Sequence, residues 1–282
     1  MALTPKISLD NTIHIIQNDN QLACSILLGK NYLTYCISDV DYKTVFHIKH
    51  FYFENKVVGK NDFDEILADN NIKKSSRINI AIDSFKSILI PNELLDENNY
   101  ASYFTFHHEL TKEEIILKQT FKSSIHDLFA VKKSTIQFLE SRLKNVHFYN
   151  ASACLLNNYP DFIVSENEHS VFLSMKDENI VLTIYQKSNL ILHQVYAYTD
   201  PLDIVYHVAN ACKQLNIKLE NCGIQLHGEM TQIENISVTL KKYFPSVRFI
   251  TRIKDIQYPD ALYSSQPTYN FFNLFSIFKC AL

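Results

Sequence analysis

The sequence contains little glycine. Only four of its 282 residues are glycine, namely Gly29, Gly59, Gly223 and Gly228, whereas an average protein has about 7%. Loops that hold phosphate groups depend on glycine, because a backbone without a Cβ can bring several N–H groups around the anion. No Gly-x-Gly, Gly-Gly or Walker pattern occurs anywhere in the chain. The composition therefore argues against ordinary nucleotide chemistry.

Cysteines at the spacing of metal ligands are also missing. The six cysteines lie far apart, mostly inside apolar runs, and none belongs to a Cys-x-x-Cys pair. This distribution favours buried free thiols over a metal site or a disulfide framework. No apolar run is long enough to span a bilayer, and residues 1–6 lack the layout of a signal peptide. We therefore expect a cytoplasmic protein without membrane insertion.

Neither sign of charge is in large excess. The chain has 27 basic and 30 acidic residues and a net charge of −3, and the two signs are interspersed. Such a surface gives no electrostatic footprint for nucleic acid or for an anionic membrane. The length and a hydrophobic content of 46% leave room for one large or two medium domains with full cores.

The clearest structural pattern lies in the second half of the chain. Three short runs rich in β-branched and aromatic residues are separated by polar turns and predict an antiparallel meander: 171–175, 180–185 and 190–196. Asp200-Pro201-Leu202-Asp203 then combines an N-cap, a proline at the first helical position and an acid in the first turn, so it predicts the start of a helix. A strand at 223–226, a helix opened by the capping box 231–234 and a strand at 247–250 complete the order β-β-β-α-β-α-β.

The first half repeats this order with different residues. Strands are predicted at 22–28, 32–37, 45–53, 77–82 and 146–149, with helices beginning near Asn61 and at the capping box Ser134–Gln137. Between the fourth strand and the second helix, residues 85–131 contain further β-like runs, as an inserted subdomain would. We therefore predict two domains, 1–160 with an insertion at about 85–131, and 161–282.

The repeated order resembles the ribonuclease-H-like halves of the actin, Hsp70 and sugar-kinase superfamily. In detail the chain is similar to a bacterial family, the domain-of-unknown-function family 3822. The segments that carry this similarity are 89–95 (LIPNELL), 206–211 (YHVANA), 224–229 (IQLHGE) and the aromatic tail that closes on 278–280 (FKC). The resemblance implies an α/β protein with mixed sheets, namely tandem ribonuclease-H-like halves in an actin-like ATPase fold, with an insertion in the first half.

The residues that would carry ATPase chemistry in this fold are mostly absent. In actin-like ATPases the first hairpin turn of each half holds phosphate and metal, typically as Asp-x-Gly. Here Leu27 and Ser174 stand in place of the two aspartates, and leucine can neither bind a metal nor accept a proton. The superfamily's adenosine-binding Gly-Gly corresponds at best to His227-Gly228. We predict no catalytic and no metal-binding residues.

Seven residues are candidates for a remnant of the cleft between the halves: Lys30, Asn31, Lys176, Asp177, His227, Gly228 and Glu229. Lys30 and Lys176 could meet an anion, although a turn lysine is more often simply solvated. His227 lies at the C-terminal end of a strand, where open α/β sheets place ligands, although most such residues are structural.

Other candidate sites are weaker. Asp83 ends a strand, but a ribonuclease-H nuclease needs partner acids on the first strand, and 22–28 has none. His107-His108-Glu109 resembles a metal tract only superficially, because adjacent strand residues point to opposite faces. The aromatic segment 269–278 could be a membrane helix, but it offers only Lys279 to anionic lipid, so we expect it to close the core or to form a partner surface.

Two functions remain in competition. The first is a catalytically silent actin-like protein without cofactor, which acts through contacts with an unknown protein partner as an adaptor or scaffold. The alternative is a divergent actin-like ATPase or phosphotransferase that binds ATP and Mg²⁺ between the halves. The missing Asp-x-Gly turns favour the first.

Overall fold

The structure is a computed structural model, and it describes residues 4–10, 22–53, 58–96, 98–121, 125–163, 169–176, 178–228, 233–250, 252–260, 262 and 267–281. By its internal contacts the chain divides into two compact units. The first unit comprises Met1–Asn157, Lys254–Ser265 and Leu274–Leu282, and the second comprises Asn158–Ile253 and Gln266–Asn273. The predicted second domain runs without interruption from 161 to 282. In the structure the chain passes back to the first unit at Lys254–Ser265 and again at Leu274–Leu282.

The first unit contains a six-stranded sheet with the order β1-β4-β3-β2-β5-β9. Its strands are β1 (Ile7–Asp10), β2 (Leu22–Leu28), β3 (Tyr32–Asp39), β4 (Val45–Tyr52), β5 (Arg77–Ile82) and β9 (Val146–Asn150). The meander of β2, β3 and β4 is antiparallel, whereas β5 runs parallel to β2 and β9 parallel to β5. Apart from β1, this is the predicted element order.

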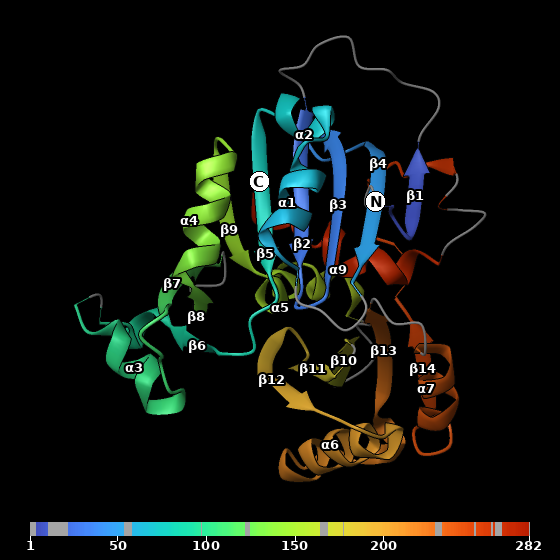
Figure 1. The fold of residues 1–282 in the computed structure, drawn as a ribbon. Coiled ribbons are helices and arrows are strands. Elements are labelled where there is room, and N and C mark those ends of the chain that lie inside the picture. Colours follow the sequence, from blue (N-terminus) through green and yellow to red (C-terminus); the bar gives the residue numbers. More distant parts are fainter. Residues whose placement is uncertain are drawn as a thin grey trace. The chain divides into compact units, whose positions relative to one another are not determined.

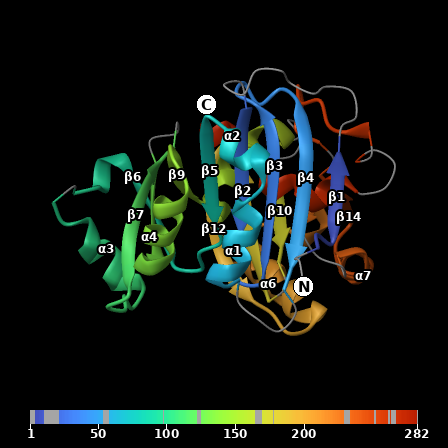
Figure 2. The same cartoon turned by 45° about the horizontal axis from the view of Figure 1, so that its top comes forward.

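Three helices cover one face of this sheet: α1 (Lys60–Leu67), α2 (Asn70–Lys74) and α4 (Lys133–Arg142) (Figure 2). Phe63, Ile72 and Leu139 bury their side chains against apolar residues of the strands. The predicted capping box Ser134–Gln137 is wrong. The chain passes from strand directly into α4 at Lys133, whose N–H donates to the carbonyl of Glu113, so Ser134 already lies inside the first turn, and the N-cap, Lys132, makes no side-chain capping bond.

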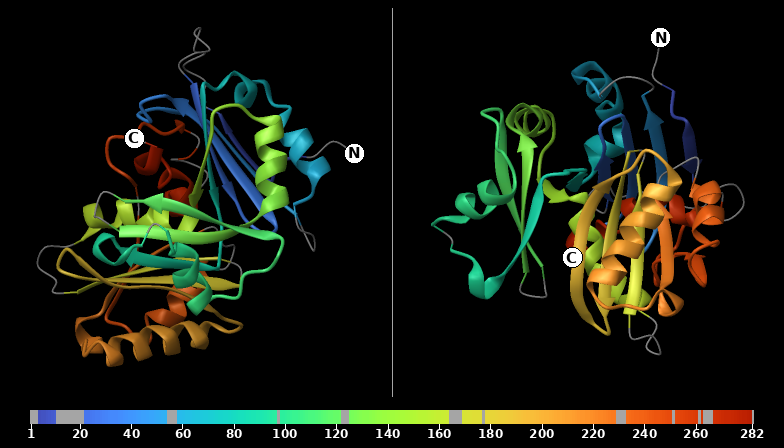
Figure 3. Two further views of the ribbon diagram at one scale, coloured as in Figure 1. Left: turned by 90° about the vertical axis from the view of Figure 1, so that its left-hand side faces the viewer. Right: turned by 90° about the horizontal axis from the view of Figure 1, so that it is seen from below.

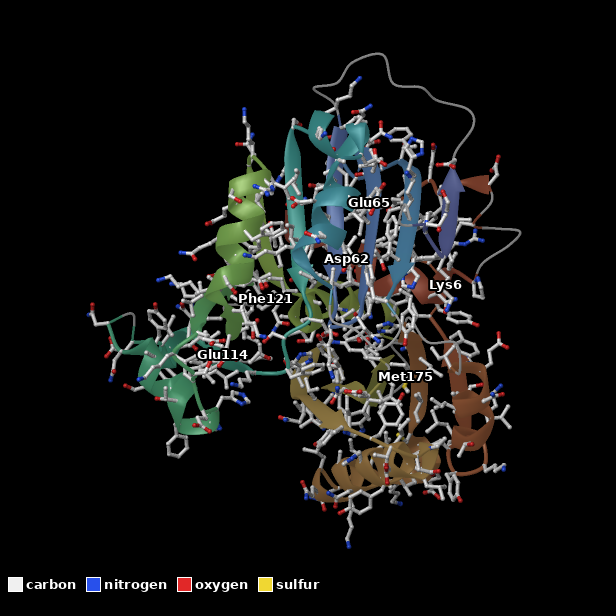
Figure 4. All side chains as sticks on the ribbon, in the orientation of Figure 1. Lys6, Asp62, Glu65, Glu114, Phe121 and Met175 are labelled. Carbon is white, nitrogen blue, oxygen red and sulfur yellow. The ribbon has the colours of Figure 1, made fainter. Side chains whose placement is uncertain are left out.

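The insertion forms a three-stranded antiparallel sheet with the order β6-β8-β7. Its elements are β6 (Ser87–Pro91), η2 (Asn92–Leu94), α3 (Tyr100–His107), β7 (Glu114–Thr120) and β8 (Ile125–Lys132). Helix α3 lies on one face of this sheet and α4 on the other (Figure 3). Phe104 of α3 and Ile136 of α4 are the buried residues that make these contacts. Glu114, at the start of β7 (Figure 4), forms an ion pair with Lys86 at 2.8 Å.

The remaining parts of the first unit are short. They are α5 (Ala151–Cys154), η3 (Leu155–Asn157) and the C-terminal α10 (Phe278–Ala281), while α9 (Phe272–Phe275) spans the boundary between the units. Phe278 packs its ring on Tyr42, and Phe275 packs on Tyr258, with centroids 4.9 and 4.7 Å apart. The end of the chain is therefore part of the core, as expected for the aromatic tail.

The second unit contains a five-stranded sheet with the order β12-β11-β10-β13-β14 (Figure 1). Its elements are η4 (Tyr159–Phe162), β10 (His169–Met175), β11 (Asn179–Gln186), β12 (Asn189–Ala197), α6 (Pro201–Gln214), η5 (Leu219–Asn221), β13 (Gly223–Gly228), α7 (Ile233–Leu240), β14 (Ser246–Phe249) and η6 (Thr268–Phe271). The first three strands form an antiparallel meander, and β13 and β14 continue in parallel. Along the chain, the strands and α-helices from β10 to β14 follow the predicted order β-β-β-α-β-α-β.

Helices α6 and α7 pack on one face of this second sheet through Ile204, Val208 and Ile236. The predicted start of α6 is confirmed: Asp200 caps the Leu202 N–H at 2.8 Å, and Asp203 accepts the Asp200 N–H at 3.0 Å. The predicted capping box of α7 falls partly outside the described residues, because Thr231 is not among them.

A buried polar network joins the insertion to the first sheet. Asp127 of β8 is fully buried and accepts a hydrogen bond from Asn150 Nδ2 at 2.9 Å. The Asn150 N–H donates to Gln119 at 3.0 Å. Burial raises the pKa of Asp127 from 3.8 to about 7, although the bond from Asn150 opposes the shift. Within the described residues, Asp127 Oδ1 has no hydrogen-bond partner.

This carboxyl should make stability depend on pH. Asp127 binds its proton more tightly in the folded than in the unfolded chain, so its contribution to the free energy of unfolding should fall as the pH rises from about 4 to about 7. An asparagine in its place would keep an acceptor for Asn150 without the charge. At pH 8 we expect the Asp127→Asn variant to be about 2–4 kcal/mol more stable than the wild type, and at pH 4 to be nearly equal to it.

Urea denaturation at pH 4 and pH 8 would measure this difference. The exposed Asp41 supplies a matched control, because Asp41→Asn should track the wild type at both pH values. If Asp127→Asn also tracks the wild type, the buried carboxyl is not a source of the pH dependence.

Candidate functional site

The first hairpin turn is closed by its own aromatic residue. Gly29, between β2 and β3, donates its N–H to the carbonyl of Tyr32 at 3.0 Å. A Cβ added at Gly29 would overlap the ring of Tyr32, so that ring lies directly on the glycine. The Tyr32 hydroxyl donates to Asp83 Oδ2 at 3.3 Å, just beyond the end of the neighbouring strand β5. The surface of the turn that a phosphate would need is therefore occupied by a tyrosine.

Lys30 and Asn31 form the rest of this turn. The carbonyl of Lys30 accepts the Val58 N–H at 3.2 Å, and that of Asn31 accepts the Phe53 N–H at 2.8 Å. The Asn31 side chain donates to the Tyr52 hydroxyl at 3.2 Å. Lys30 is exposed and Asn31 is half-buried. Both residues are thus fixed by contacts to the end of β4 and the segment that follows it.

The second hairpin turn is closed as well. Ser174 is fully buried, and its hydroxyl donates to Asn273 Oδ1 at 3.1 Å. Met175 ends β10 (Figure 4). The Lys176 N–H donates to the carbonyl of Asn179, and the carbonyl of Lys176 accepts a hydrogen bond from the Tyr198 hydroxyl at 2.8 Å. Lys176 is only 6% exposed, so this turn lysine is not simply solvated. Asp177 lies outside the described residues.

His227 is part of an aromatic cluster in the second unit. It is fully buried, its Nε2 shares a hydrogen bond of 2.8 Å with the Tyr159 hydroxyl, and its ring lies against Phe272 at 4.5 Å. Tyr159 in turn stacks on Phe172 with centroids 4.2 Å apart. Burial, and secondly the charge of Lys176, lower the pKa of His227 to about 3. His227 is therefore neutral near pH 7 and is held as a core residue.

Gly228 is required by close packing of two strands. Its φ of +139° lies in a region that residues with a Cβ rarely adopt. Gly228 pairs with Met175 in the parallel ladder of β10 and β13, and a Cβ at Gly228 would overlap the Met175 backbone. The glycine thus serves the approach of one strand to the next. Glu229 lies outside the described residues.

The candidate residues fall into two groups. In the parallel ladder of β10 and β13, Ser174 pairs with His227 and Met175 pairs with Gly228. Lys176, His227 and Gly228 therefore lie at the same end of these two strands. Lys30 and Asn31 belong to the first unit. Nothing in the sequence indicated the roles of Tyr32, Tyr159 and Asn273. Asn270 and Ser276 also interrupt the apolar tail, so no local pattern set Asn273 apart.

A metal centre is not formed by the part of the chain that the structure describes, where no group of three or more His, Cys, Asp or Glu side chains is placed to hold an ion. Nor, among those residues, is any helix long and apolar enough to cross a membrane. Among the described residues at the two turns, the side chains do not fit Mg·ATP. Leu27 and Ser174 are buried and offer no carboxylate, Ser174 is hydrogen-bonded to Asn273, and the ring of Tyr32 covers Gly29.

The chain matches a protein family and is similar in structure to solved proteins. A family model described as "Protein of unknown function (DUF3822)" matches residues 10–247. A Bacteroides thetaiotaomicron protein with an actin-like ATPase fold and unknown function is 18% identical, with a TM-score of 0.79 over 95% of this chain and 100% of that one. No curated protein sequence matches the chain.

A second similar structure comes from the PilM–PilN type IV pilus biogenesis complex. It is 10% identical, with a TM-score of 0.63, and the similarity covers 92% of this chain and 97% of that one. At such identities the likeness is one of fold. The predicted actin-like ATPase fold is confirmed.

Proposed function

Because the chain belongs to the DUF3822 family and has the actin-like ATPase fold, we propose that it is a non-catalytic member of this fold. It acts through protein–protein contacts, as an adaptor or scaffold. The observation that carries the proposal is the bond between Ser174 and Asn273 at 3.1 Å. Ser174 stands where an ATPase has a metal-positioning acid, and here it is buried under the chain's own C-terminal segment.

The aromatic cluster supports the same conclusion. Phe272, next to Asn273, packs on His227, which is bonded to Tyr159. Opening this end of the sheet to a ligand would remove several large rings from the core, and burying each ring is worth about 1.5–3 kcal/mol. A ligand would have to supply that free energy before it gained any affinity of its own.

The first turn supports the proposal independently. Tyr32 covers Gly29 and binds Asp83, and the Gly29 N–H donates to the Tyr32 carbonyl, so this amide is not presented to an anion. Leu27, in place of the other aspartate, is buried and offers no oxygen to a hydrated Mg²⁺. Protein binding fits the fold more broadly, since one similar structure comes from a complex of two proteins.

A phosphate-release assay tests the proposal. Purified full-length protein with millimolar Mg·ATP should release phosphate no faster than the buffer does. Turnover that is lost in Lys176→Ala, but kept in Lys187→Ala in the next hairpin turn, would favour the alternative of a divergent ATPase. A protein partner captured on the chain should be retained equally with and without Mg·ATP, because an adaptor without a nucleotide site cannot be released by nucleotide.

A further inference from the structure

Two cysteines of the first unit lie side by side although they are far apart in the sequence. Cys154 ends α5 and is buried, whereas Cys280 in the C-terminal helix α10 is only partly buried. The thiol of Cys154 forms a hydrogen bond with Cys280. The pair therefore combines a partly exposed cysteine with a buried one.

Two amide donors reach the sulfur of Cys280, whose own S–H donates a long hydrogen bond to the Ser276 carbonyl at 3.9 Å. Its sulfur accepts amide N–H groups from Asn157 Nδ2 at 3.3 Å and from Gln119 Nε2 at 3.6 Å. Lys279 Nζ donates to the backbone carbonyl of the same Asn157 at 3.3 Å. Amide donors favour the ionised form of a thiol, and the thiolate is the reactive form.

Cys154 differs from Cys280 chiefly in its burial. Burial, reinforced by the hydrogen bond with Cys280, raises the pKa of the Cys154 thiol well above its ordinary value. Gln119 also donates to Cys154 and opposes this shift, but burial has the larger effect, so Cys154 keeps its proton. The two thiols are therefore suited to different roles in a reaction.

We propose that Cys280 is a peroxide-reactive thiol and that Cys154 is its resolving partner. The Cys280 thiolate attacks one oxygen of hydrogen peroxide, the O–O bond breaks, and Cys280 becomes a sulfenic acid while hydroxide leaves and takes up a proton as water. The Cys154 sulfur then attacks the Cys280 sulfur, and the hydroxyl group leaves as water with the Cys154 proton. In total, two thiols and one peroxide give one disulfide and two waters.

The product ties α10 to α5 within the first unit. It closes a covalent loop over more than a hundred residues, and such a cross-link constrains the unfolded chain. Oxidation therefore fixes the C-terminal end of the chain in its native place, and the oxidised protein should melt at a higher temperature than the reduced protein.

The second unit supplies an internal comparison. The sulfurs of Cys212 and Cys222 are 3.5 Å apart, and both residues are fully buried. If proximity alone governed oxidation, this pair would form a disulfide as readily. If access and amide donors govern it, the pair of Cys154 and Cys280 reacts first.

Mass spectrometry of the full-length chain decides between these outcomes. The reduced protein is treated with a small excess of hydrogen peroxide, remaining thiols are alkylated at intervals, and peptides are quantified. We expect the Cys154–Cys280 disulfide to form at least about tenfold faster than Cys212 or Cys222 is lost. Cys154→Ser should leave Cys280 as a sulfenic acid that dimedone traps, and Asn157→Ala should slow oxidation because it removes the nearer amide donor.

Circular dichroism of each variant checks that its fold is kept, and the same treatment of the wild-type chain in urea serves as the unfolded control. The proposal is overturned if Cys212 and Cys222 oxidise first. It is also overturned if Cys280 reacts no faster in the native chain than in the unfolded chain, because its environment would then contribute nothing.

Discussion

A chain that ends before Tyr269 should fail to fold or should melt far below the full-length protein. The segment contributes six large apolar side chains that are almost completely buried: Phe271, Phe272, Leu274, Phe275, Ile277 and Phe278. Burial of each is worth about 1.5–3 kcal/mol, so their combined loss is comparable to the whole stability of a typical domain, about 5–15 kcal/mol. Both units should suffer, since the segment belongs to the second unit up to Asn273 and to the first unit from Leu274.

Thermal melting followed by circular dichroism would measure the effect of the deletion. A matched pair of single substitutions keeps the test informative if the deleted chain does not fold. Phe272→Ala should cost about 3–5 kcal/mol, whereas Phe106→Ala, at a side chain that is 84% exposed, should cost almost nothing. A truncated chain that melts like the full-length protein and loses only its affinity for lipid vesicles would instead mean that the tail is a membrane helix.

Replacing Gly228 by alanine should be among the most damaging single substitutions in the second unit. The φ of +139° is disfavoured for any residue with a Cβ, at a cost of about 1–3 kcal/mol. The Cβ would also overlap the Met175 backbone, and forcing atoms into a packed core costs about 1–3 kcal/mol more. We expect a loss of at least about 3 kcal/mol in the free energy of unfolding.

Gly223 offers the control for this substitution. It begins the same strand β13, and a Cβ added there meets nothing within 4 Å. Gly223→Ala should therefore be neutral or stabilising by about 0.4–1 kcal/mol, because alanine restricts the unfolded chain. Urea denaturation of both variants gives the comparison. Equal midpoints for the two would show that Gly228 does not carry the close approach of β13 to β10.

The fold could be predicted because its signals are local. The meanders appear as short apolar runs between polar turns, and Asp200 caps α6 through atoms only a few residues away. Ser134 shows where local reasoning is insufficient. Its sequence context matches a capping box, but β8 continues to Lys132 and its pairing with β7 decides where α4 begins. Tertiary hydrogen bonding overrode the local pattern.

For the candidate site, the sequence predicted only which groups are missing. Leu27 and Ser174 in place of acids are visible in the sequence, whereas the groups that close the turns are mostly not. Asn273 reaches Ser174 from almost a hundred residues away, and a pattern of neighbours cannot reveal such a contact. For the same reason His227 looked like a strand-end ligand, since its partners Tyr159 and Phe272 come from distant segments.

We propose above all that the chain has the actin-like ATPase fold but no nucleotide site. Calorimetric titration of the purified full-length protein with Mg·ATP tests it most directly. We predict no saturable heat and no submillimolar affinity, because Tyr32 covers Gly29 in the first turn and Asn273 accepts a hydrogen bond from the hydroxyl of Ser174 in the strand before the second. Saturable micromolar binding that depends on Mg²⁺, and that Lys176→Ala weakens while Lys187→Ala does not, would contradict the claim.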